Sequence, residues 1–175
     1  PVVLTYHCDL QLPEGTADEV RDFVRRLFRE NYVRDANGRE PEVLDWHGRR
    51  VKFHAPNFDH AFSEATNYRL SAGVHDEPLS VRRAQRLLWI KEAIAGTAGT
   101  IEVRGQVRRD SRGRERKRRT LIVVEERYVV VLQPCGKDGY EYEFVTAFPA
   151  DRAYVDKIRR ESALLEKKMP QSYGD

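Results

Sequence analysis

The alternation of apolar and polar residues predicts a β-meander in the second half of the chain. Four strand-like runs follow one another there: Thr100–Arg109, Arg119–Glu125, Tyr128–Gln133 and Tyr140–Phe148. The turns between these runs are rich in Gly, Pro, Asp and Ser, which favour turn geometry. We therefore expect a four-stranded antiparallel sheet.

The same runs indicate how this sheet divides into faces. The third run is apolar at every position from Tyr128 to Leu132, as expected of a central strand covered on both sides. The first run alternates polar or basic residues with the apolar Ile101, Val103 and Val107, which predicts one dry and one wet face. In the last run, simple alternation leaves open which face is buried, and it groups Thr146 with Tyr140, Tyr142, Phe144 and Phe148.

The clearest helix precedes the meander. Thr16 and Glu19 have the spacing of a capping box, and apolar residues follow at helical intervals as far as Phe28. A turn sequence that begins at Asp35 ends this helix. Before the helix, looser alternation over Val2–Leu12 predicts a strand.

Three further elements are expected. Val51–His54 has the composition of a short strand, and Ser80 has the position of a cap for a helix that ends near Gly96. A last helix is expected over about Asp151–Lys168. One stripe of this helix carries Tyr154, Val155, Ile158, Ser162, Leu165 and Met169.

These elements predict an α+β fold, in which N-terminal helices pack on a four-stranded antiparallel meander followed by a C-terminal helix. The length of 175 residues is sufficient for one core. We interpret residues 1–50 as a strand-plus-helix elaboration of unknown role, and residues 51–170 as the domain that contains the meander.

The charge of the chain is concentrated in one hairpin. The net charge is +3, yet residues 108–119 hold eight basic and two acidic residues, a local charge of +6. Arginine binds phosphate through a planar fork of donors. We therefore predict a nucleic-acid-binding surface, with a solvated hairpin tip as the alternative, formed by Arg104, Arg108, Arg109, Arg112, Arg114, Arg116, Lys117, Arg118 and Arg119.

Several classes of protein are disfavoured by motifs that the chain lacks. Its two cysteines, Cys8 and Cys135, make no disulfide framework, and no Cys/His cluster has the spacing of zinc ligands. Glycine-rich phosphate loops and nucleophile elbows are also missing. No apolar run is long enough for a membrane span. We expect a cytoplasmic protein that uses no metal or other cofactor and binds no membrane.

His60 is the strongest candidate among the five histidines for acid–base chemistry. It lies between Phe58 and Phe62 and beside Asp59, where a loop changes into a helix. Histidine titrates near neutral pH, as a general base must. The alternative is a structural histidine, and His54, six residues earlier, is a second candidate.

The order of five short motifs resembles one known superfamily. They are Phe58–Ser63, Arg82–Ile90, Arg127–Leu132, Phe144–Phe148 and Lys157–Arg160. Together they are similar to the phage-associated members of the barnase, EndoU, colicin and RelE-like nucleases. The resemblance covers about residues 58–168, so residues 51–170 would be the nuclease domain.

This resemblance implies a metal-independent ribonuclease. In such enzymes the ribose 2′-hydroxyl attacks the adjacent phosphate, a base takes its proton, and cations stabilise the charge on phosphorus. His60 would then be the base or acid, and Arg82, Arg83 or Arg104 the phosphate ligand. The remaining members of the predicted site are Tyr128 and Thr146, of which Thr146 would orient the phosphate.

We therefore expect a toxin-like endoribonuclease that cleaves structured RNA such as tRNA and has an acidic inhibitor or antitoxin as partner. One alternative is a nucleic-acid-binding module without catalysis, in which the histidine is structural. Another is an accessory protein of a phage particle that docks its basic hairpin on an acidic protein. Cleavage of RNA separates the first hypothesis from the other two.

Overall fold

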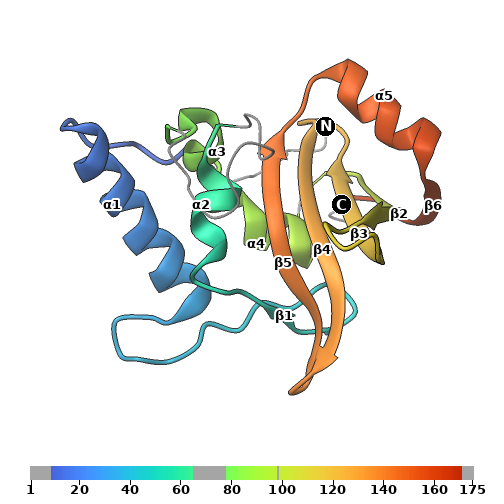
Figure 1. The fold of residues 1–175 in the computed structure, drawn as a ribbon, viewed down its shortest axis with the longest axis horizontal. Helices are drawn as coiled ribbons and strands as arrows, with labels where there is room; N and C mark the ends of the chain where they lie inside the picture. The colour runs from blue at the N-terminus through green and yellow to red at the C-terminus, as the bar shows by residue number, and fades with distance from the viewer. Residues whose placement is uncertain (1–8, 65–77, 98, 171–175) are drawn as a thin grey trace, which may run out of the picture.

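The computed structural model describes residues 9–64, 78–97 and 99–170 of the chain. A six-stranded mixed sheet forms its centre, in the order β1–β5–β4–β3–β2–β6 (Figure 1). The strands are β1 (Val51–Lys52), β2 (Ile101–Arg109), β3 (Glu115–Val123), β4 (Tyr128–Lys137), β5 (Tyr140–Pro149) and β6 (Ala163–Lys168). The helices are α1 (Ala17–Phe28), a π-helical turn (Arg29–Val33), α2 (Asn57–Phe62), α3 (Val81–Gln85), α4 (Trp89–Ala95) and α5 (Arg152–Glu161).

The fold is α+β, as predicted, but the sheet is larger than the predicted four strands. Strands β2 to β5 form an antiparallel meander in which each strand pairs with the next. The sheet gains β1, which pairs with β5 in parallel, and β6, which pairs with β2 antiparallel. The expectation of four strands was wrong. The strand predicted at Val51–His54 forms as the shorter β1, but its pairing with the meander was not predicted, and the residues of β6 follow a helical sequence pattern.

Only the first part of the predicted C-terminal helix is helical, and its second part is a strand. Helix α5 ends at Glu161, Ser162 is extended, and β6 then pairs along β2. The guanidinium of Arg104 donates to the carbonyl oxygens of Arg159 and Ser162, 3.3 and 3.2 Å away, and so satisfies the helix end. Leu165 is 57% exposed and does not join the apolar stripe of α5. Pairing with the open edge of β2 therefore overrides the helical spacing.

The predicted start of α1 is confirmed. The Thr16 hydroxyl accepts from the Glu19 amide at 3.2 Å, and the Glu19 carboxylate accepts from the Thr16 amide at 2.8 Å. Val24 and Phe28 are buried on the inner face of the helix. Of the predicted strand Val2–Leu12, residues 1–8 lie outside the described residues, and residues 9–12 are in no strand.

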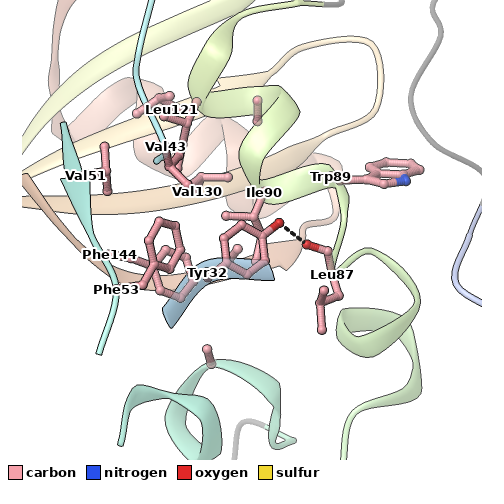
Figure 2. Close-up of a cluster of buried hydrophobic side chains, with 14 of the residues drawn as sticks. Tyr32, Val43, Val51, Phe53, Leu87, Trp89, Ile90, Leu121, Val130 and Phe144 are labelled. Atoms are coloured by element: carbon pink, nitrogen blue, oxygen red, sulfur yellow. Dashed lines mark hydrogen bonds between the residues drawn. The ribbon is translucent and has the colours of Figure 1, made fainter. Parts of the chain in front are cut away.

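The helix predicted from Ser80 to Gly96 is broken into α3 and α4. Two tyrosine hydroxyls donate to the carbonyl oxygens at the break: Tyr32 to Leu87 at 2.6 Å (Figure 2), and Tyr128 to Arg86 at 3.3 Å. These bonds replace those that a continuous helix would make. The predicted ends are confirmed, because Ser80 caps α3 and Gly96, at φ 68°, ends α4.

The main core lies between one face of the sheet and helices α1 to α4, which Figure 1 shows on the same side. Phe53 stacks between Tyr32 and Phe144, with ring centroids 4.6 and 4.8 Å away (Figure 2). Phe28 of α1 packs against the same group. Residues from both sides of position 50 therefore share one core, and the division of the chain there stays a prediction.

Helix α5 covers only part of the opposite face. Its Val155 and Ile158 pack on Ile122 of β3 and Val129 of β4 in a second, smaller core. Figure 1 shows α5 alone on that side of the sheet. Beyond α5 this face carries polar and charged side chains, among them Gln106 and Arg108 of β2, as predicted. Val107, which was predicted to lie on the dry face, is 60% exposed, so that part of the prediction was wrong.

A β-bulge at Val145 places Phe144 and Thr146, which were predicted to share a face of β5, on opposite faces. In register with β4, Thr146 opposes Val131 and Phe144 opposes Leu132, so Val145 is an extra residue. Phe144 is fully buried in the main core, whereas Thr146 lies on the opposite face. The prediction that these two residues share a face was wrong, because simple alternation assumes an unbroken strand.

Candidate functional site

A pocket of about 500 Å³ opens beside α5 on the smaller-core face of the sheet. Strands β2 to β5 form its floor, while α2 and α3 reach it around the outer edge of β5. This edge is accessible because β1 pairs with β5 only at Tyr142 and Glu143. The basic and polar side chains in its lining include His60, Arg82, Arg83, Arg108, Arg118 and Thr146.

Helix α2 positions His60. Phe58 and Phe62, one turn apart, stack on each other at 5.2 Å and are buried in the main core. On the outer side, the guanidinium of Arg21 donates to the Asp59 carboxylate at 3.1 Å and to the Ser63 hydroxyl at 2.8 Å. Anchored on both sides, α2 places His60, which is half-buried, in the wall of the pocket.

Helix α3 contributes Arg82 and Arg83. The guanidinium of Arg83 donates to the Ala61 carbonyl at 3.2 Å and lies 5.2 Å above the ring of Phe148. These contacts hold Arg83 between α2 and β5. Arg82 is exposed at the rim of the same pocket. The structure thus brings together His60, Arg82 and Arg83, which the sequence motifs suggested as a site.

The floor of the pocket supplies two more arginines. Arg108 of β2 is exposed, and Arg118 of β3 is half-buried. Burial, and then the positive charge of Arg108, lower the pKa of Arg118 from its ordinary value. Beside them, the Thr120 hydroxyl donates to Gln106 at 2.7 Å. The pocket therefore combines a half-buried imidazole with a strong positive charge.

Tyr128, predicted as a site residue, lies on the other side of the sheet. It is 1% exposed, and its ring packs edge-on against Trp89 at 5.5 Å. Its hydroxyl donates to the Arg86 carbonyl. Tyr128 shares its face of β4 with Val130 and Leu132, which point into the main core. It does not line the pocket.

Arg104 also does not line the pocket. Its guanidinium forms a 2.9 Å salt bridge with Glu102, which pairs with Arg159 of α5 at 2.7 Å. Burial of Glu102 opposes its ionisation, but the hydrogen bonds and charges of Arg159 and Arg104 outweigh it and lower the pKa of Glu102. Arg104 therefore attaches α5 to the sheet.

The remaining cations of the hairpin are divided between two faces by strand alternation. Arg114 and Arg116 pair with Asp110 at 3.1 and 3.2 Å. Arg119 faces away from the pocket, where it pairs with Glu166 and lies 5.3 Å above the ring of Tyr142. Three further cations are exposed and form no salt bridge among the described residues: Arg109, Arg112 and Lys117. Of the nine predicted nucleic-acid ligands, Arg108 and Arg118 line the pocket.

Sequence reasoning missed three polar residues of the lining: Gln106, Asp151 and Tyr154. The Asp151 carboxylate caps α5 by accepting from the Tyr154 amide at 2.7 Å. The position of Asp151 before a helix was visible in the sequence, but its place beside β5 was not. The second candidate histidine, His54, pairs with Glu143 at 3.2 Å and is not part of the lining.

Two further observations concern the described residues. No three of their His, Cys, Asp and Glu side chains are grouped to hold a metal ion, and Cys135 is a free thiol. None of their helices has the length and apolar character needed to cross a membrane.

Comparison of the chain with models of protein families, with curated proteins and with solved structures finds no match. The resemblance to the barnase, EndoU, colicin and RelE-like nucleases therefore stays a prediction from short motifs. The function proposed below rests on the residues of the pocket themselves.

Proposed function

We propose that the protein is a metal-independent endoribonuclease that cleaves structured RNA by transesterification. One observation carries this proposal: His60 shares a pocket with the guanidinium groups of Arg82, Arg83, Arg108 and Arg118. A neutral imidazole can accept a proton near pH 7, and arginines attract and orient a phosphodiester. Both requirements of the reaction meet in one place.

The reaction assigns a step to each group. His60 takes the proton of the ribose 2′-hydroxyl, the 2′-oxygen attacks phosphorus, and the bond from phosphorus to the 5′-oxygen breaks. The arginines stabilise the extra negative charge on the phosphoryl oxygens. Tyr154 lines the same pocket, and its hydroxyl is the acid that gives a proton to the leaving oxygen. The products are a 2′,3′-cyclic phosphate and a 5′-hydroxyl end.

The surroundings of the pocket suit a folded RNA such as tRNA. Arg109 and Arg112 extend the positive charge along the exposed hairpin, where they can contact backbone phosphates outside the pocket. The toxin-like role, the cytoplasmic location and an acidic inhibitor or antitoxin belong to the same proposal. Acidic side chains on such a partner would neutralise the arginines of the pocket.

Incubation of purified protein with total tRNA in excess EDTA tests the proposal. We expect discrete fragments that end in 2′,3′-cyclic phosphate, and a cleavage rate about 10²–10⁴-fold lower for His60→Ala. His54→Ala is the matched control, because this histidine pairs with Glu143 outside the pocket, and it should cleave at the wild-type rate. Equal cleavage by wild type and His60→Ala, or fragments with 3′-hydroxyl ends, would contradict the proposal.

A binding module without catalysis is the second candidate. The observation that favours it is the composition of the pocket, where His60 is accompanied by arginines, which stay protonated and cannot act as bases. In that case tRNA would be bound, in a salt-dependent manner, and recovered whole. His60→Ala would then change neither the affinity nor the integrity of the RNA.

A further inference from the structure

Two buried polar atoms in the pocket have no hydrogen-bond partner among the described residues. They are the Thr146 hydroxyl oxygen on β5 and the Nε atom of Arg118 on β3. Both residues line the same pocket. Leaving a buried donor unsatisfied costs about 1–3 kcal/mol, so folded proteins seldom do it without a reason. A ligand with two acceptor oxygens would satisfy both atoms.

The positive charge around Arg118 indicates that the ligand of this pocket is an anion. Two other arginines of the hairpin strands have carboxylate partners: Arg104 pairs with Glu102, and Arg119 with Glu166. Arg118 forms no salt bridge among the described residues, although the charge of Glu143 favours its protonated form at longer range. The Asp151 carboxylate in the lining already caps α5. The lining thus holds four arginines against one carboxylate, and among the described residues no salt bridge neutralises Arg118.

The two groups are far enough apart to hold one phosphate between them. Thr146 opposes Val131 of β4, and Val131 opposes Thr120, which is two residues from Arg118 on the same face of β3. Two strand spacings of about 4.8 Å and an offset of two residues, about 3.4 Å each, separate the backbones of Thr146 and Arg118 by roughly 12 Å. The long side chain of Arg118 spans part of this distance, and a tetrahedral phosphate can fill the remainder.

Another part of the lining is apolar. Val129 and Val131 form its floor, and Tyr154 and Ile158 of α5 form one wall. The Tyr154 ring is held edge-on by Phe148 at 5.5 Å. A nucleobase is flat and largely apolar on its faces, and it stacks on such surfaces. The pocket thus has a cationic part and an apolar part, side by side.

We infer that this pocket holds a single nucleotide, with its phosphate between Arg118 and Thr146 and its base against the apolar part near Tyr154. The identity of the ligand as an RNA nucleotide rests on the proposed function. The guanidinium donates to one phosphoryl oxygen and the Thr146 hydroxyl to another. Arg118 and Thr146 thereby determine where the phosphate lies relative to His60.

Isothermal titration with uridine 3′-monophosphate and with inorganic phosphate tests the inference. We expect Arg118→Met and Thr146→Val each to weaken nucleotide binding about tenfold or more, as loss of a charge-assisted hydrogen bond does. Arg118→Lys keeps the charge without the fork and should fall between wild type and Arg118→Met. Lys137→Met is the control, since this exposed cation of β4 does not line the pocket, and it should bind as wild type does.

The stability of the two variants distinguishes a binding role of these residues from a structural role. Because Thr146→Val removes a buried hydroxyl without a partner, its denaturation midpoint should equal or exceed that of the wild type. The same is expected of Arg118→Met. Loss of affinity together with loss of stability in both variants would overturn the inference, because the residues would then support the fold.

Failure of the nucleotide subsite and failure of the nuclease proposal would give different results. Wild-type protein that binds the nucleotide but leaves RNA whole would remove the nuclease and keep the subsite. Cleavage by wild type with unchanged nucleotide affinity in both variants would overturn the subsite and keep the nuclease. Equal affinity for inorganic phosphate and uridine 3′-monophosphate, unchanged by Tyr154→Ala, would overturn the role of the apolar part.

Discussion

Two hydroxyl groups on neighbouring strands, those of Tyr128 and Thr146, have opposite surroundings. The Tyr128 hydroxyl is enclosed by the main core and donates to the Arg86 carbonyl, where α3 gives way to α4. The Thr146 hydroxyl is buried in the pocket without a partner among the described residues. Both residues have types that are common in strands. The position of each side chain on its strand separates the structural role of Tyr128 from the binding role proposed for Thr146.

Tyr128→Phe should therefore affect stability and leave cleavage intact. Removing the hydroxyl leaves the Arg86 carbonyl without this donor, and we expect a loss of about 1 kcal/mol in the free energy of unfolding. Urea denaturation followed by circular dichroism measures this loss. A variant with unchanged stability and strongly reduced cleavage of tRNA would contradict the assignment and return Tyr128 to the site.

At the scale of elements, helix α5 depends on a small ionic network. Glu102 of β2 has 9% of its side chain exposed and accepts from Arg104 at 2.9 Å and from Arg159 of α5 at 2.7 Å. The network fixes α5 over the sheet, and α5 in turn supplies Tyr154 and Ile158 to the pocket. The pocket wall therefore depends on this carboxylate.

The lowered pKa of Glu102 predicts how stability changes with pH. Since the pKa is lower in the folded than in the unfolded chain, the network stabilises the fold above the unfolded value of about 4.3. This contribution is lost as the pH falls through the lower, folded pKa. Glu102→Gln should cost about 2 kcal/mol at neutral pH and flatten the stability profile in this acidic range.

Urea denaturation between pH 2 and 7 checks this expectation. Asp156→Asn is the matched control, because Asp156 approaches the same Arg159 at 3.9 Å but is 44% exposed. Its cost should stay below about 0.5 kcal/mol, as for other exposed ion pairs. If both variants cost the same at neutral pH, Glu102 does not fix α5 as described.

At the scale of the whole molecule, the N-terminal segment and the meander fold on one core. Phe28 of α1 contacts Phe53, Phe58, Phe62 and Phe144, with ring centroids 5.5–6.2 Å apart. The indole of Trp46 donates to Glu166 of β6 at 2.8 Å, which joins the early part of the chain to its last strand. Separate unfolding of residues 1–50 would expose much of this core.

We therefore predict that both parts of the chain unfold in one cooperative transition. Trp46 lies before position 50 and Trp89 after it, so the variants Trp46→Phe and Trp89→Phe each leave one fluorescent reporter. In each variant, the fluorescence of the remaining tryptophan should give the same urea midpoint as circular dichroism. A lower midpoint for Trp46 fluorescence than for circular dichroism in Trp89→Phe would show that residues 1–50 unfold independently.

The sequence by itself determined the local features of this protein. The capping box of Thr16 and Glu19, the end of α4 at Gly96 and the antiparallel runs of the meander were all predictable, because residues close in the chain make the interactions that produce them. The motifs also drew attention to His60 and to the arginine-rich hairpin. What these residues approach is not encoded locally.

Tertiary structure decided the rest. The bulge at Val145 puts Thr146 in the pocket, pairing with β2 turns residues 163–168 into a strand, and the Tyr32 hydroxyl accompanies the break before α4. Helix α2 reaches around the edge of β5, so that His60 lines the same pocket as Arg118, which is 58 positions later in the chain. Each of these outcomes depends on contacts between segments that are distant in the chain. The strand pairing, burial and hydrogen bonds of these contacts stabilise the observed structure more than local propensity favours the alternative.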